Sequence, residues 1–184
     1  IGVPQLMRRA VAERAEKEFK LPQANLVMNA SHTHSGPQLR TTPLTERDDQ
    51  RAKDAWEYTQ KLQNDIVGII GKALAEMQPT RLTWNKARCG FAMNRRRDYT
   101  LPPDHPNANK APNPNGPVDH EVPALRVEAP DGTLRATLFG YACHNTSLGF
   151  YNYCGDYAGF AQEYLQEHRP GFTALFLMGC GGDQ

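Results

Sequence analysis

Proline density in the middle of the chain places the tightest constraint on its fold. Residues 102–117 hold six of the fourteen prolines, together with four asparagines. Proline fixes the backbone φ angle and has no amide N–H, so neither a helix nor a central strand survives that density. We therefore predict a long irregular loop here, and loops of this length in a compact domain are usually functional lids or disordered segments.

Periodic apolar residues on both sides of this loop predict the regular elements. Helical spacing indicates helices from about Val3 to Lys20 and from Thr45 to Gln78, and a third from a capping Asp156 to about His168. Short apolar or alternating runs predict strands over 25–30, 81–88, 122–129, 134–143 and 172–178. The Asp131-Gly132 turn makes the third and fourth of these a hairpin, and the final strand–helix–strand order is typical of parallel pairing. The fold class is therefore α/β, with a mixed β-sheet core flanked by helices.

Length and charge limit the kinds of protein this chain can be. Its 184 residues suit one domain or part of a larger one, and 21 basic against 20 acidic side chains give a net charge of +1. That balance predicts no nucleic-acid partner, and no apolar run approaches the roughly 20 residues of a membrane span. Because the chain opens on Ile1 and stops in a glycine-rich turn after a predicted strand, we expect a fragment. The four cysteines have no CxxC spacing, so a zinc knuckle is not expected, while free thiols and disulfides both remain open.

Three polar clusters each follow a predicted strand. They are Ser31–Pro37, His144–Ser147 and Gly179–Gln184. Ligands of open α/β sheets bind beyond the carboxyl ends of parallel strands. If the strands are parallel, the clusters converge on one edge of the sheet and form a site.

The residue types in these clusters suit a metal-dependent hydrolase. Neutral imidazole is a zinc ligand, so His32, His34 and His144 are candidates, although solvated or structural histidines give the same pattern. The sequence leaves the third ligand open between His34, Asp156 and Asp183. One arginine of Arg95–Arg97 would stabilise an oxyanion, or the run is simply a solvated patch. The final glycines match neither a P-loop nor a dinucleotide fingerprint.

Taken in order, these motifs resemble the neutral/alkaline non-lysosomal ceramidase family. The segment Asn29–Pro37 reads N-A-S-H-T-H-S-G-P and is similar to the S/T-H-T-H-S-G-P motif of that family. Further similarities, weaker alone, follow in the family's order: Asn94-Arg95, Val118–Glu121, Tyr141–His144, Asp156–Gly159 and Gly182-Asp183.

The resemblance implies a zinc-dependent amidohydrolase that cleaves the N-acyl bond of a ceramide-like lipid. By resemblance, His32 and His144 are zinc ligands, and His34 and Arg95 are catalytic residues that stabilise the oxyanion. The remaining ligands, a Glu and a Tyr, and a serine of the G-D-x-S-P-N motif are expected downstream of Gln184. Residues 1–184 would then be a partial N-terminal catalytic domain, truncated at both ends. The resemblance also suggests a secreted, periplasmic or membrane-associated protein, with peripheral membrane contact, and leaves the oligomeric state open.

Three alternatives remain at this stage. A divergent relative would hydrolyse another amide or ester. A (β/α)₈ barrel also carries an H-x-H after its first strand, but needs about 250 residues. The third alternative is a binding or scaffold domain that has kept the fold but lost the catalytic activity, and it would not hydrolyse N-acyl amides.

Overall fold

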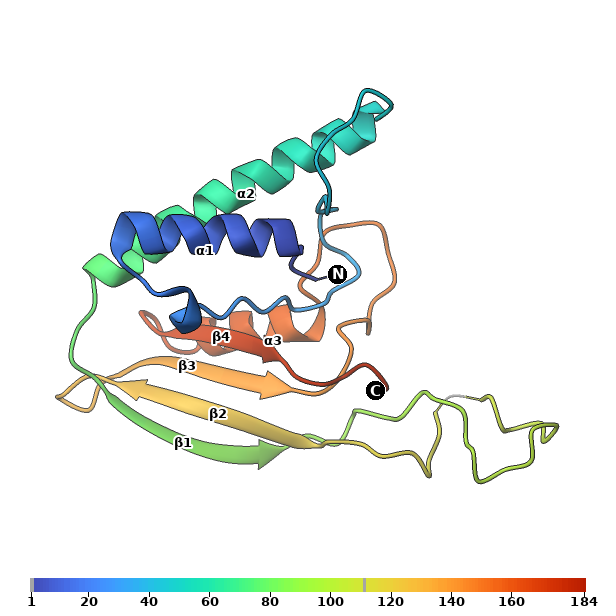
Figure 1. Cartoon of the computed structure of the whole chain (residues 1–184). Coiled ribbons are helices and arrows are strands. Elements are labelled where there is room, and N and C mark those ends of the chain that lie inside the picture. Colours follow the sequence, from blue (N-terminus) through green and yellow to red (C-terminus); the bar gives the residue numbers. More distant parts are fainter. Residues whose placement is uncertain (1, 111) are drawn as a thin grey trace. The chain divides into compact units, whose positions relative to one another are not determined.

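The described part of the chain, residues 2–110 and 112–184, forms an α/β fold in this computed structural model (Figure 1). Its elements are, in order, α1 (Gln5–Phe19), the 3₁₀ helix η1 (Gln23–Asn25), α2 (Gln50–Ala75), β1 (Arg81–Arg88), β2 (Glu121–Glu128), β3 (Leu134–Tyr141), α3 (Asp156–Glu167) and β4 (Thr173–Met178). They divide into two compact units, a helical one that runs to Ala30 and resumes over Gly36–Gln78, and a sheet unit of Ser31–Ser35 with the described part of Pro79–Gln184. No helix of the described residues is both long and apolar enough to cross a membrane.

The helical unit is built on the packing of α1 against α2. Met7 and Val11 of α1 and Val67 of α2 form its buried centre, with Leu62, Ile66 and Ile70 packed around them. Both predicted helices are confirmed, but α2 begins later than the periodicity suggested. The Asp49 carboxylate accepts a hydrogen bond from the Ala52 N–H at 2.8 Å, and this N-cap fixes the start.

The strand predicted over residues 25–30 is wrong. Only η1 is regular here, and residues 26–30 belong to no helix or strand. Leu26 and Met28 pack against the α1–α2 core instead of against a sheet. Val27, between them, is 81% exposed, so the short apolar run is covered on one side only. Periodicity in so short a run cannot show whether a helix pair or a sheet covers it.

The sheet of the second unit has the order β1-β2-β3-β4 (Figure 1). The pairs β1–β2 and β2–β3 are antiparallel, whereas β3 and β4 are parallel and joined through α3. The mixed sheet, the hairpin and the crossover are thus confirmed. An antiparallel hairpin inside the sheet that carries His144 excludes the barrel alternative.

Aromatic side chains join α3 to the sheet. Tyr157 of α3 stands edge-on to Phe176 of β4 with ring centroids 5.9 Å apart, and Phe176 in turn meets Phe139 of β3 at 5.4 Å. Such offset pairs add specific geometry to apolar burial. They fix α3 against β3 and β4, the two strands whose carboxyl ends carry polar clusters.

Asp156 does not cap α3 as predicted. Gly155 occupies the N-cap position, and Asp156 is the first helical residue, with a left-handed φ of 55°. Its buried carboxylate accepts hydrogen bonds from the Ser147 hydroxyl at 2.5 Å and the Leu148 N–H at 3.0 Å. The side chain therefore anchors the loop that follows β3.

The proline-rich segment is irregular, as predicted. The described residues of 102–117 include no helix or strand, and the loop extends beyond the end of the sheet (Figure 1). At its base the buried Asp98 carboxylate accepts hydrogen bonds from the Thr100 hydroxyl at 2.5 Å and the Asn115 amide at 2.8 Å. These two bonds, the Thr100 hydroxyl foremost, lower the pKa of Asp98, so the carboxylate that closes the loop stays ionised.

Candidate metal centre

Three histidines from two distant segments meet in the sheet unit. His32, His34 and His144 each offer a ring nitrogen, and these atoms all lie within 4.8 Å of one another. The ring centroids of His32 and His144 are 4.7 Å apart, and His34 lies 5.3 Å from His32 and 5.8 Å from His144. The donor set of three imidazoles suits a divalent transition metal, because neutral imidazole is a common ligand of zinc.

The H-x-H segment is fastened to the loop before α3. The Thr33 hydroxyl donates to the Cys154 carbonyl at 2.8 Å, and the Cys154 N–H donates to the Ser35 carbonyl at 3.0 Å. Immediately before the first of these anchors, His32 adopts a left-handed φ of 61°, which is uncommon for a residue other than glycine. The segment reaches the site although no strand precedes it, so two of the three predicted strand-end clusters follow strands and the first does not.

His144 is oriented by the glycine-rich turn after β4. Its Nδ1 lies 2.6 Å from the Gly181 carbonyl oxygen, and its backbone N–H donates to the Gln184 carbonyl at 3.1 Å. A carbonyl oxygen only accepts, so this contact favours the tautomer with the proton on Nδ1 and the lone pair on Nε2. Metal-ligating histidines use such a contact to fix tautomer and ring direction.

Close backbone approach explains the glycines of this turn. A Cβ atom on Gly181 would lie 2.7 Å from the backbone nitrogen of Cys143, and one on Gly179 would lie 3.2 Å from the Tyr141 backbone. The turn therefore crosses directly over the end of β3. These two glycines allow the contact of the turn with His144. Sequence reasoning missed this contact, because nothing in a run of glycines identifies the segment that it will touch.

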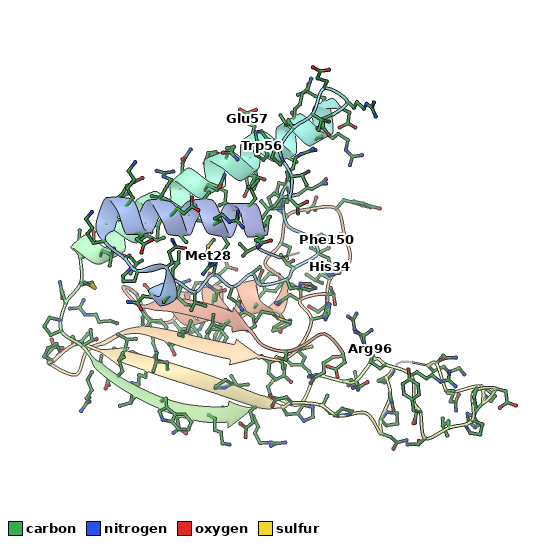
Figure 2. All side chains as sticks on the ribbon, in the orientation of Figure 1. Met28, His34, Trp56, Glu57, Arg96 and Phe150 are labelled. Carbon is green, nitrogen blue, oxygen red and sulfur yellow. The ribbon has the colours of Figure 1, made fainter. Side chains whose placement is uncertain are left out.

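Arg95 reaches the same place from the segment after β1. Its Nη2 lies 3.0 Å from Nε2 of His144 and 3.1 Å from the Gly182 carbonyl oxygen. Arg96 donates to that carbonyl at 2.6 Å. Both His34 and Arg96, labelled in Figure 2, project beyond the arrowheads of β3 and β4. Arg95 therefore contacts the histidine cluster, although its side chain is exposed.

The asparagine of the N-R pair has a structural task. Asn94 is buried, donates to the Pro117 carbonyl at 2.8 Å and accepts from the Arg96 N–H at 2.9 Å. The Arg95 N–H donates to the Asp183 carbonyl at 2.8 Å. Backbone and side-chain contacts together aim Arg95 at His144.

Two carboxylates considered as ligands do not join the histidines. Among the described residues the group comprises the three imidazoles and no carboxylate. Burial raises the pKa of Asp156, but the hydrogen bonds led by that of the Ser147 hydroxyl outweigh it, so the pKa is lowered overall. The Asp183 carboxylate lies 3.4 Å from the Asn94 amide.

The cysteines add no ligand to this set. All four are free thiols. Burial raises the pKa of Cys143, the neighbour of His144, so it remains a thiol at neutral pH.

Comparison with known proteins identifies the family of this chain. The profile of neutral/alkaline non-lysosomal ceramidases, N-terminal, matches residues 2–174. The chain belongs to this ceramidase family. A comparison with curated proteins gives no match.

Solved ceramidase structures share the fold of this family member. A neutral ceramidase from Pseudomonas aeruginosa and a structure described as "Ceramidase complexed with C2" each match with a TM-score of 0.70 and 22% identity. Each match covers 99% of this chain and 29% of the other, so the chain spans less than a third of the structures that it matches.

Proposed function

We propose that residues 1–184 are the part of a zinc-dependent amidohydrolase that supplies its histidine ligands, within a partial N-terminal catalytic domain. The substrate of the whole enzyme is the N-acyl bond of a ceramide-like lipid. One observation carries the proposal: three imidazole nitrogens from segments more than a hundred residues apart lie within 4.8 Å, in a chain of the ceramidase family. The proposal requires no nucleic-acid partner.

His32 and His144 would hold the zinc ion. The Nδ1 contact of His144 with Gly181 leaves Nε2 as its ligand atom. Zinc, when bound, would polarise the scissile carbonyl and lower the pKa of a water molecule toward about 7. Without a metal, Arg95 donates a hydrogen bond to the same Nε2. A bound metal would use the lone pair of this nitrogen and so replace that hydrogen bond.

Arg95 and His34 would then stabilise the developing oxyanion. A guanidinium released from His144 still has the Gly182 carbonyl as an anchor at 3.1 Å, and its other N–H groups are available to a substrate oxygen. His34 is the exposed member of the cluster, which suits a residue that meets substrate. Its ring nitrogen is also one of the three that lie within 4.8 Å of one another. The zinc content of a His34 variant therefore distinguishes a hydrogen-bond donor from a third zinc ligand.

Metal analysis and turnover of full-length variants test these roles separately. His32→Ala and His144→Ala should each lose zinc and activity. Arg95→Ala and His34→Ala should keep zinc and lose about a hundredfold or more in turnover, as expected for an oxyanion donor. His105→Ala, at an exposed histidine of the proline-rich loop, is the matched control.

The substrate panel separates the alternatives. We expect hydrolysis of N-acylsphingosines. Turnover restricted to simpler N-acyl amines or esters would indicate a divergent relative, and zinc binding without turnover on any of them would indicate a domain without the chemistry. Intact zinc content in His32→Ala and His144→Ala would refute the assignment of the ligands.

A further inference from the structure

A buried asparagine links the two histidine segments. Asn145, next to His144, is 1% exposed. Its Nδ2 donates to the Ser31 carbonyl, immediately before His32, and lies 3.6 Å from the Met178 sulfur at the end of β4. Its Oδ1 accepts from the Ala158 N–H of α3 at 3.3 Å. One carboxamide thus touches the H-x-H segment, the end of β4 and the first turn of α3.

The contact with Ser31 bears directly on His32. A left-handed conformation is unfavourable for a residue with a Cβ and persists only where the surroundings fix it. The φ of His32, 61°, is the rotation about its N–Cα bond, relative to the Ser31–His32 peptide plane. By holding the carbonyl of that plane, Asn145 fixes the direction from which the His32 ring enters the cluster.

The contact with α3 holds the carboxamide oxygen of Asn145. Helix α3 starts at a glycine N-cap that offers no side-chain hydrogen bond. The first N–H groups of a helix need outside acceptors, and Asn145 supplies one to Ala158 from a distant part of the chain. The Asp156 carboxylate accepts hydrogen bonds from the backbone N–H groups of Ser147 and Leu148, further along the same loop.

We propose that Asn145 is a positioning residue of the metal centre, which sets the separation of His32 and His144 by joining both to α3. The inference rests on the proposed function, because the separation matters only if these histidines hold a metal. The position requires a donor toward Ser31 and an acceptor toward Ala158, which a carboxamide provides together. Aspartate has the same shape, but it would place a carboxylate oxygen, which only accepts, against the Ser31 carbonyl oxygen, and the hydrogen bond would be lost.

Zinc affinity of the full-length protein tests the proposal. We expect Asn145→Asp to weaken zinc binding by about 10- to 100-fold in competition with a chromophoric chelator, the usual cost of losing a residue that orients a metal ligand. The visible spectrum of the cobalt(II)-substituted variant should change as well, because it reports the ligand geometry. Asn152→Asp makes the same chemical change at an exposed position of the same loop and should bind zinc as the wild type does.

A double-mutant cycle separates positioning from general stability. If Asn145 acts through His32, Asn145→Asp should have little further effect on the residual zinc affinity of a His32→Ala background, measured by zinc titration because that variant is expected to lose its zinc on isolation. A change in affinity of equal size in both backgrounds would overturn the proposal. So would an affinity within about threefold of wild type in folded Asn145→Asp.

Asn145→Ser, which buries no charge, provides a second variant. Affinity is judged on whichever variant keeps a cooperative unfolding transition. If neither does, Asn145 supports folding alone and the proposal fails. Unchanged zinc affinity in His32→Ala and His144→Ala would instead refute the proposed function, so the two failures are distinguishable.

Discussion

At the scale of single residues, backbone proximity explains features that side-chain chemistry does not. Gly181 and Gly182 are neighbours in the turn after β4, yet a Cβ on Gly181 would meet the Cys143 backbone at 2.7 Å, whereas one on Gly182 would meet nothing within 4 Å. The Gly181 carbonyl is also the partner of His144 Nδ1. The two glycines therefore offer a matched pair of substitutions.

We expect Gly181→Ala to lower the free energy of unfolding by about 1–3 kcal/mol, the usual cost of forcing extra atoms into a packed place. Displacement of its carbonyl should weaken zinc binding as well. Gly182→Ala should change neither quantity appreciably. Urea unfolding and zinc competition on both variants measure this, and equal behaviour of the pair would contradict the close approach.

Asp156 should make the stability of the fold depend on pH. Its pKa is lowered in the folded state, because the hydrogen bonds led by that of the Ser147 hydroxyl outweigh the burial that raises it. A carboxyl with a lowered folded pKa stabilises the fold above its unfolded value of about 3.9, and this contribution is lost as the pH falls through the folded value.

Asp156→Asn should therefore destabilise the protein at pH 7 by about 1–3 kcal/mol, since buried donors lose a charged acceptor. The difference from wild type should shrink as the pH falls below about 4. Urea midpoints measured between pH 3 and pH 7 test the trend. Asp104→Asn, at an exposed position, serves as the control, and a difference that stays constant with pH would exclude the carboxylate as its cause.

At the scale of elements, the ends of helices are set by individual hydrogen bonds. The apolar spacing that predicted α2 began near Thr45, but the helix starts at Gln50, directly after the Asp49 N-cap. Helix α3 has no side-chain hydrogen bond from its N-cap, Gly155. Its first N–H groups are accepted by Asp156, the first helical residue, and by Asn145 from the loop after β3. The start of α2 is therefore set by its N-cap, whereas the start of α3 also needs an acceptor from a distant part of the chain.

Removal of the local cap gives a prediction for α2. Asp49→Ala should cost about 1 kcal/mol of stability, because the Ala52 N–H loses its acceptor. Glu57→Ala, at an exposed position inside the same helix (Figure 2), should have a much smaller effect. Thermal unfolding of both variants measures the difference, and equal destabilisation would argue against capping.

At the scale of the whole molecule, the proposed metal site would link metal binding to folding. A ligand that binds only the folded state stabilises it by about 2.7 kcal/mol at a concentration of one hundred times Kd. The proposed site joins Ser31–Ser35 to residues far along the chain, so zinc should oppose separation of these segments.

Zinc should therefore raise the unfolding temperature of the full-length protein, and chelation should reverse the change. His144→Ala should remove the zinc response, while His168→Ala, at an exposed histidine after α3, should retain it. Differential scanning calorimetry across a zinc titration gives the measurement. A response that survives in His144→Ala would place the stabilising metal elsewhere.

The sequence by itself determined the elements whose signals are local. The hairpin around Gly132, the α3 crossover and the irregular proline segment follow from turn residues, periodicity and the properties of proline. The H-T-H-S-G-P block also identified the family, since residue types at fixed spacing are readable without coordinates.

Only the tertiary structure decided what depends on segments far apart in the chain. It replaced the strand over residues 25–30 with packing on a helix pair, and it brought His34 into the same set of ring nitrogens as His32 and His144. It also supplied the Gly181 contact and the Asn145 link. Neither leaves a local signal, because a carbonyl or a carboxamide has the same appearance in any sequence until the fold selects its partner.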